Sequence, residues 1–204
     1  MWRLQKGQEA SWGGVGQASG DACAGQVPLN KVAIFGHSYV SHLDLRHPQV
    51  EAGLYIKKFG RRGAKVSNIR DDAIWGQLLH YVPQVTFLII GGNDVNADTD
   101  IAQLAKDIEE LAREIEQRTG GYCFIFGLEK RTQPRGISAE DYNRARNGIN
   151  RRLKRQLSFA RTRYISMGVN EDDLGDGVHL TLEAGARVMQ IIVEKARDHF
   201  KQSK

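Results

Sequence analysis

Cysteine is scarce in this sequence, and long apolar runs are absent from it. The 204 residues contain two cysteines, Cys23 and Cys123, which excludes a disulfide scaffold and a cysteine-rich zinc module. No apolar run approaches the roughly 18–20 residues that a membrane span needs. The net charge of +5 is too small by itself to indicate a nucleic-acid-binding protein. Residues 1–10 carry charges where a secretory signal peptide would be apolar, so we expect a cytoplasmic protein.

The N-terminal segment, residues 1–28, lacks the pattern of a folded core. It holds six glycines and no apolar periodicity. Such a segment cannot offset its ordering entropy by burying apolar surface. We therefore expect a flexible tail over residues 1–28 and one domain over residues 29–204, a length typical of a single domain.

From residue 31 onward, short apolar runs alternate with helical patterns. Strands are expected at Lys31–Gly36, Leu54–Phe59, Val85–Ile90, Tyr122–Gly127 and Arg163–Met167. Apolar residues at three- and four-residue steps indicate helices at about Ile101–Arg118, Ala139–Leu157 and Leu182–Lys201, with a weaker one at about Ile69–His80. Continuously apolar strands are typical of a parallel sheet that is covered on both faces. The pattern predicts a doubly wound α/β fold, in which the site lies beyond the carboxyl ends of the strands.

Three of the strands end in segments that can take part in acyl chemistry. Ser38 follows the first strand and can present a hydroxyl nucleophile together with its own N–H; alternatively, it only caps the next helix. Gly63 follows the second strand and can donate a backbone N–H, or it is a plain turn glycine. Asn93 follows the third strand and can donate a side-chain N–H to developing negative charge, or it belongs to a polar turn.

A fourth segment, Asp176-Gly177-Val178-His179, lies between the last strand and the last helix. Its carboxylate can fix the imidazole tautomer of His179 and stabilise the imidazolium, although a solvated loop pair has the same pattern. Each segment taken alone has a simple structural explanation. All four fall where the site of an α/β sheet must be, and together they supply a nucleophile, oxyanion donors and an oriented base. Their combination favours the catalytic interpretation.

With these motifs in place, the sequence resembles the SGNH (GDSL-type) hydrolases from roughly Lys31 to the C-terminus. The four blocks of that family are matched by Gly36-His37-Ser38, Gly63, Gly91-Gly92-Asn93-Asp94 and Asp176-Gly177-Val178-His179. The resemblance implies a flavodoxin-like, three-layer α/β/α fold with a five-stranded parallel sheet in the order 2-1-3-4-5. It also implies a carboxylic ester hydrolase that needs no metal or cofactor. Its catalytic triad would be Ser38, Asp176 and His179, and its oxyanion hole Ser38, Gly63 and Asn93.

The residue before the serine departs from the family pattern, which usually has aspartate there. We expect His37 to be a neutral, solvent-facing loop residue that leaves the triad intact. The Gly36-His37-Ser38 sequence is also similar to esterase-like domains in the first open-reading-frame product of some LINE-type retrotransposons. An α/β-hydrolase nucleophile turn, Gly-x-Ser-x-Gly, is excluded because Val40 occupies the second glycine position.

Two functions remain open at this point. The first is a serine esterase that hydrolyses small, acetyl-type esters through an acyl-enzyme. The second is a catalytically lapsed module with the same fold that binds lipid, glycan or nucleic acid, with a retroelement particle as one setting for such a module. Hydrolysis of p-nitrophenyl acetate, with a Ser38→Ala control, separates the two.

Basic residues gather on the expected helix at about Ala139–Leu157. A solvated helix face explains this cluster, and so does a weak contact with the phosphates of anionic lipid or nucleic acid. The cluster comprises Arg144, Arg146, Arg151, Arg152, Lys154 and Arg155, of which Arg144, Arg151, Arg152 and Arg155 are the candidate contacts. A second basic pair, Arg61 and Arg62, precedes Gly63 and is either a pair of loop charges or a feature that favours an acidic substrate.

Overall fold

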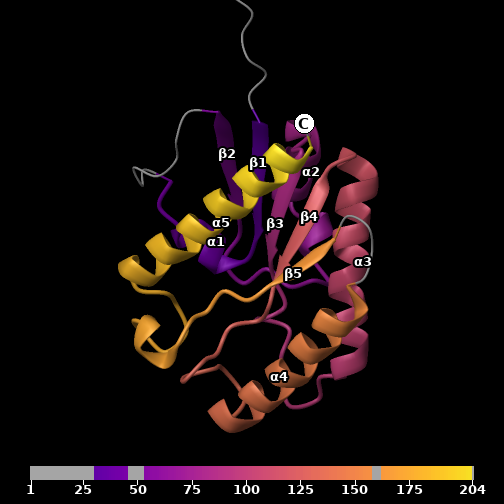
Figure 1. The fold of residues 1–204 in the computed structure, drawn as a ribbon. Coiled ribbons are helices and arrows are strands. Elements are labelled where there is room, and N and C mark those ends of the chain that lie inside the picture. Colours follow the sequence, from indigo (N-terminus) through magenta and orange to yellow (C-terminus); the bar gives the residue numbers. More distant parts are fainter. Residues whose placement is uncertain (1–29, 46–52, 158–161, 204) are drawn as a thin grey trace, which may run out of the picture.

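The computed structural model describes residues 30–45, 53–157 and 162–203 (Figure 1). The tail expected over residues 1–28 lies outside the described residues. Five parallel strands form one sheet in the order β2-β1-β3-β4-β5, which confirms the predicted order. The strands are β1 (Asn30–Gly36), β2 (Leu54–Gly60), β3 (Val85–Ile89), β4 (Tyr122–Phe126) and β5 (Arg163–Ile165). The ends of each strand lie within two residues of the predicted ones.

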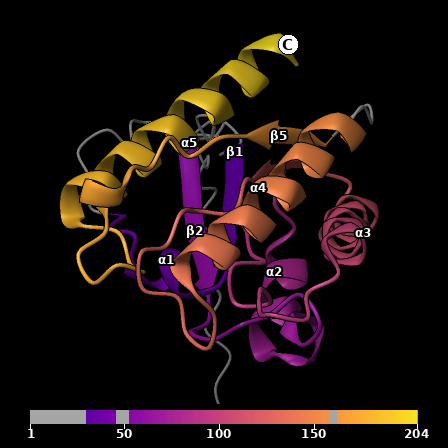
Figure 2. The same ribbon diagram turned by 90° about the horizontal axis from the view of Figure 1, so that it is seen from below.

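Helices cover both faces of the sheet and make three layers (Figures 1 and 2). On one face lie α1 (Ser38–His42) and α5 (Leu182–Gln202). On the other lie α2 (Ala73–Tyr81), α3 (Ile101–Thr119) and α4 (Ala139–Gln156). The short 3-10 helices η1 (Ile69–Asp71) and η2 (Glu171–Asp173) lie in connections. Within the described residues, no helix combines the length and the apolar character that a membrane span requires.

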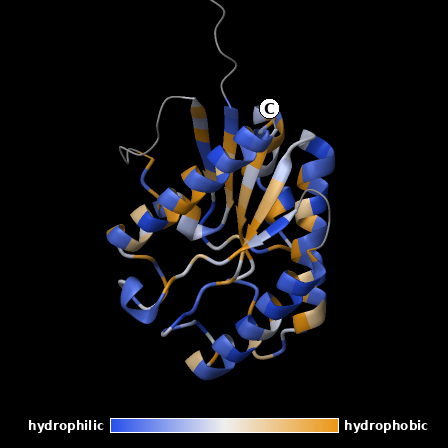
Figure 3. Ribbon diagram, in the orientation of Figure 1, coloured by the Kyte–Doolittle hydropathy of each residue, from blue (hydrophilic) through white to orange (hydrophobic). Residues whose placement is uncertain are grey.

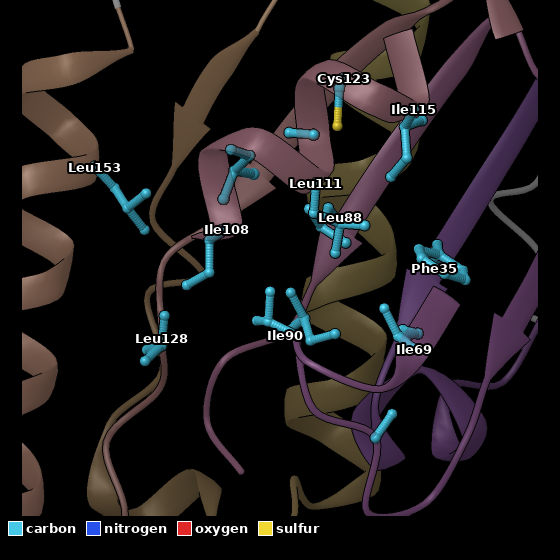
Figure 4. Packing of buried hydrophobic residues seen from close by; sticks show 14 of the residues in the cluster. Phe35, Ile69, Leu88, Ile90, Ile108, Leu111, Ile115, Cys123, Leu128 and Leu153 are labelled. Atoms are coloured by element: carbon cyan, nitrogen blue, oxygen red, sulfur yellow. The ribbon is translucent and has the colours of Figure 1, made fainter. Parts of the chain in front are cut away.

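The two apolar faces of the sheet explain its continuously apolar strands. Figure 3 shows hydrophobic strands enclosed by helices whose outer surfaces are hydrophilic. In β1, Ala33 and Phe35 pack toward α2 and α3, while Val32 and Ile34 pack toward α5. Figure 4 shows the first of these clusters, in which Ile108 and Leu111 of α3 meet Leu88 of β3. Burial on both sides is the reason that these strands carry no polar alternation.

The expected helix at Ile69–His80 is two helices in the structure. Asp72 has extended backbone, with ψ of 147°, and ends η1. Its side chain accepts a hydrogen bond from the backbone N–H of Ile74 at 3.0 Å and so caps α2. An aspartate whose carboxylate bonds the backbone nearby favours a cap over a continuous helix. The helical spacing of apolar residues therefore continues across Asp72, although one helix ends and the next begins there.

The turn after β1 brings the chain tightly against β3. Gly36 has a φ of +150°, and a Cβ placed on it would lie 1.8 Å from the carbonyl oxygen of Ile89. The N–H of His37 then donates to that same oxygen at 3.0 Å. Only glycine allows this approach, so Gly36 fixes where the chain leaves the sheet. The residues that follow it lie at the carboxyl edge, which Figure 2 views from below.

Candidate active site

Ser38 is the first residue of α1, directly after this turn, and is 6% exposed. The structure corrects the simple explanation that Ser38 caps the helix. His37 is the N-cap, because its Nδ1 accepts a hydrogen bond from the backbone N–H of Tyr39 at 3.3 Å. The Ser38 side chain is thereby left for other contacts.

His37 is buried, which contradicts the expectation that it faces solvent. It is 4% exposed. Burial, with smaller contributions from the charges of Arg131 and His179, lowers the pKa of His37 to about 3. The imidazole is therefore neutral over the physiological range, as expected, but for the reason that it is buried. As the helix cap, His37 holds the turn that carries Ser38.

The backbone N–H groups of Ser38 and Gly63, which both lie at this edge, have no hydrogen-bond acceptor among the described residues. Gly63 has a φ of +72° and lies in a turn in which the N–H of Ala64 donates to the carbonyl of Arg61 at 3.3 Å. A side chain at position 63 would be strained in this conformation. Both N–H groups are therefore available to a ligand.

Asn93 lies in the turn after β3, and its amide is held on both sides. Its Nδ2 donates to the carbonyl of Ala64 at 3.0 Å, and its Oδ1 accepts from Arg131 Nη2 at 3.1 Å. One N–H of the amide is thus used and the other remains to donate. Next to it, the Asp94 carboxylate accepts from the N–H of Val66 at 3.0 Å, which ties the turns after β2 and β3 together. Burial raises the pKa of Asp94 to about 6.

Asp176 and His179 are side by side, as their spacing predicts. Asp176 Oδ2 lies 2.8 Å from His179 Nδ1, and its Oδ1 accepts from the backbone N–H groups of His179 at 2.6 Å and Val178 at 3.0 Å. The hydrogen bond from the His179 side chain is the largest of the causes that hold the pKa of Asp176 well below its usual range. Asp176 is therefore ionised, and with Nδ1–H donating to it, His179 keeps Nε2 as an acceptor.

Contacts from other segments hold the Asp176–His179 loop in place. The Tyr39 hydroxyl donates to the carbonyl of Val178. The carbonyl of Gly177 accepts from the N–H groups of Thr132 at 2.9 Å and Gln133 at 3.2 Å. The residue after Ser38 and the loop after β4 therefore determine where His179 lies.

The ring of His42 packs edge-on against the ring of His179, with 5.0 Å between centroids. His42 is exposed, and its Nε2 lies 3.2 Å from Arg62 Nη2. Since a guanidinium only donates, Nε2 accepts and His42 is neutral in this contact. Burial and neighbouring positive charges lower the pKa of His42. His42 is one helical turn after Ser38, so its place at the site follows from the helix that begins there.

All five predicted site residues line one pocket of about 750 Å³. These residues are Ser38, Gly63, Asn93, Asp176 and His179. Among the described residues, no hydrogen bond joins Ser38 Oγ to His179. Catalytic hydrogen bonds are often long in a free enzyme and shorten when substrate binds. In the part of the chain that the structure describes, no group of three or more His, Cys, Asp and Glu residues is arranged to hold a metal ion.

Arg131 is a site residue that the sequence pattern does not reveal. It is 7% exposed, donates to Asn93, and its guanidinium lies 5.2 Å from the centre of the Tyr142 ring. It follows β4, whose end carries no motif, and it reaches Asn93 across 38 residues of sequence. In the sequence, only its position after a strand indicates a site residue, and many other residues have such a position.

The basic residues on α4 differ in their ion pairing with the other described residues. Arg144 forms ion pairs with Glu140 and Asp141, both at 2.7 Å, so it belongs to the charge pattern of the helix itself. Arg151 and Arg155 are exposed. Contact of this face with anionic lipid or nucleic acid remains a prediction.

The fold and the pocket together define an α/β protein with serine, histidine and aspartate at the carboxyl edge of its sheet. No protein-family model and no curated protein matches the chain. Solved structures of low sequence identity share its fold. A GDSL-like lipase from Bacteroides thetaiotaomicron superposes with a TM-score of 0.64 and 16% identity, over 83% of this chain and 88% of that one. A carbohydrate esterase of family 3 from Talaromyces cellulolyticus has a TM-score of 0.63 and 14% identity, over 85% and 99%.

An acetyl esterase gives a TM-score of 0.63 and 15% identity, over 86% of this chain and all of that one. At these identities the likeness shows the fold, which this chain therefore shares with GDSL-type esterases and lipases. The neighbours give no support to the narrower resemblance to a retrotransposon domain.

Proposed function

We propose that this protein is an SGNH-type serine esterase that hydrolyses small acyl esters through an acyl-enzyme. One observation carries the proposal: a single pocket is lined by Ser38, by the Asp176–His179 pair at 2.8 Å, and by Gly63 and Asn93. A fold shared with esterases and lipases supports it.

In acylation, the Ser38 hydroxyl attacks the ester carbonyl carbon while His179 Nε2 takes its proton. The carbonyl double bond opens, and its oxygen becomes negatively charged in the tetrahedral intermediate. When that intermediate collapses, the bond to the alcohol breaks and His179 returns the proton to the leaving oxygen. The ionised Asp176 stabilises the imidazolium in between. Water then repeats the sequence on the acyl-enzyme, which releases the acid and restores Ser38.

Three donors are suited to the oxyanion: the N–H groups of Ser38 and Gly63 and the remaining amide N–H of Asn93. All three belong to turns that glycines or hydrogen bonds hold fixed, so they need no rearrangement as charge develops. Losing one such donor typically slows turnover about 10²–10³-fold. We therefore expect Asn93→Ala to lower kcat by about that factor while KM stays nearly constant.

Small acyl groups are the proposed substrates. Ser38 is 6% exposed and lies directly after a turn that packs against the sheet. Gly36 and Gly60 allow the close approach of the backbone there. The specific acyl group is tested by comparing p-nitrophenyl acetate, butyrate and octanoate. We expect kcat/KM to fall with chain length.

The decisive experiment compares two serines on one helix. Ser38→Ala removes the proposed nucleophile, whereas Ser41→Ala removes a serine of α1 that does not line the pocket. We expect Ser38→Ala to abolish hydrolysis of p-nitrophenyl acetate and Ser41→Ala to retain it. A fluorophosphonate probe should label Ser38, as mass spectrometry of the folded protein can determine.

The opposite result would favour the second function, a catalytically lapsed binding module. If the wild type hydrolyses no ester and the probe labels nothing, the esterase proposal is wrong. The replacement of aspartate by His37 is no argument for lost catalytic activity, because the buried, neutral His37 caps the helix and holds the turn that carries Ser38.

A further inference from the structure

The pocket that holds Ser38 is lined by an excess of positive charge. Arg62, Lys65, Arg131 and Arg135 line it, and among the described residues Asp176 is the only carboxylate that does so. Asp176 is already occupied by His179 and by two backbone N–H groups. The described part of the chain therefore presents four cations and no free anion to this pocket.

None of these four cations forms an ion pair with another described residue. Arg62 contacts a neutral His42 side chain instead. By contrast, Arg61, the residue before it, forms an ion pair with Asp72. The basic pair singled out in the sequence is thus divided: one arginine is neutralised outside the pocket, and the other lies unneutralised inside it.

Arg131 gives independent support because it is buried. It is 7% exposed, and its Nε has no hydrogen-bond partner among the described residues. Among the described residues no ion pair joins Arg131 to the nearby Glu129. Burial also raises the pKa of Glu129 to about 8. A buried arginine without a carboxylate is costly unless an anion nearby compensates its charge, and phosphate and carboxylate groups are the anions that protein cations usually bind.

We propose that the ester substrate carries an anionic group, a phosphate or a carboxylate, which Arg62, Lys65 and Arg135 bind in the pocket beside Ser38. Arg131 lies deeper, where it adds positive potential while it holds Asn93. This inference rests on the proposed esterase function for its reaction and on the charge of the pocket for its substrate. The ligand is a small soluble ester, because the cations line a pocket of about 750 Å³, a volume typical of small-molecule sites.

The test compares esters that differ in charge and little else. One pair is 2-acetoxyethyl phosphate and 2-acetoxyethanol, and the other is 4-acetoxybutanoate and 4-acetoxybutanamide. We expect kcat/KM to be about tenfold higher for the anionic member of at least one pair at low salt, since several weak ion pairs add to about that factor. The ratio should fall in 0.5 M salt, where charges are screened beyond about 3–5 Å. A ratio of one or below in both pairs would overturn the proposal.

Variants then assign the preference to the pocket. The triple variant Arg62→Gln, Lys65→Gln and Arg135→Gln should bring the ratio of anionic to neutral ester close to one. Arg61→Gln is the matched control, because it removes an adjacent cation that Asp72 already pairs, and it should keep the ratio. An unchanged ratio in the triple variant would contradict the assignment.

Binding separates a failure of this inference from a failure of the esterase function. Ser38→Ala protein should bind 2-hydroxyethyl phosphate or 4-hydroxybutanoate, the product alcohols of the two anionic esters, in a calorimetric titration, and the triple variant in the same background should bind neither. Hydrolysis of neutral esters without binding of either anion would refute the anion site and leave the esterase intact. Phosphate binding without hydrolysis would refute the esterase alone. Binding to phosphatidylglycerol vesicles but not to the soluble phosphate would refute a small-ester ligand.

Discussion

Replacing Arg131 by methionine should impair catalysis through Asn93 even on a neutral ester. The guanidinium donates to Asn93 Oδ1 at 3.1 Å. This contact fixes the orientation of the amide, so that one N–H points toward the carbonyl of Ala64 and the other toward the pocket. Hydrogen bonds from charged donors contribute about 1.5–3 kcal/mol. Loss of that contact lets the amide rotate, while the bond to Ala64 still restrains it. We therefore expect kcat for p-nitrophenyl acetate to fall about 10–100-fold, below the 10²–10³-fold loss of the whole donor.

A double-mutant cycle tests whether this effect passes through Asn93. If it does, Arg131→Met should cost little once Asn93→Ala is present, because the group that it positions is gone. KM should change little in either variant, and Arg131→Lys should recover part of kcat. Urea unfolding of each variant checks that the protein remains folded. Losses that simply add, or an effect confined to KM, would refute the positioning role.

Four further predictions concern buried groups and the N-terminal segment. His37→Asn should leave the dependence of kcat/KM on pH unchanged between about pH 5 and 9, because a histidine with a pKa of about 3 does not titrate there; a shifted acidic limb would make His37 part of the catalytic machinery. The wild type should also lose stability as the pH falls from about 6.5 toward 3, since only unfolded His37 takes up a proton in that window, and thermal unfolding of His37→Asn should show a smaller loss. Glu129 has the opposite sign: its pKa is raised to about 8, so its contribution to stability declines as the pH rises from about 4.5 to 8, and Glu129→Gln should flatten that decline in urea unfolding. Deletion of residues 1–27 should leave the melting temperature and the ester hydrolysis rate unchanged, because that segment has no core-forming pattern; a lower value of either would place the domain boundary earlier.

The sequence by itself determined the architecture and the places where chemistry can occur. Short apolar runs such as Val85–Ile89 favour strands covered on both faces, and the helical period of Ile101–Thr119 specifies one buried stripe. Parallel strands bring their carboxyl ends to one edge, so the motifs at Ser38 and Asn93 had to meet there. The three-residue spacing of Asp176 and His179 was enough to predict their contact, because a short bent segment closes on itself.

Burial and long-range pairing were decided only by the tertiary structure. A histidine next to a serine carries no sign of its exposure, and His37 became a buried helix cap because the turn after Gly36 packs against β3. Arg131 reached Asn93 because two loops far apart in the sequence meet above the same sheet edge. Arg61 and Arg62 are neighbours in sequence, yet one pairs with Asp72 and the other lines the pocket, because successive side chains in a turn point in different directions. Local pattern specifies which elements form, whereas the charge and solvation of each side chain depend on which distant groups those elements bring beside it.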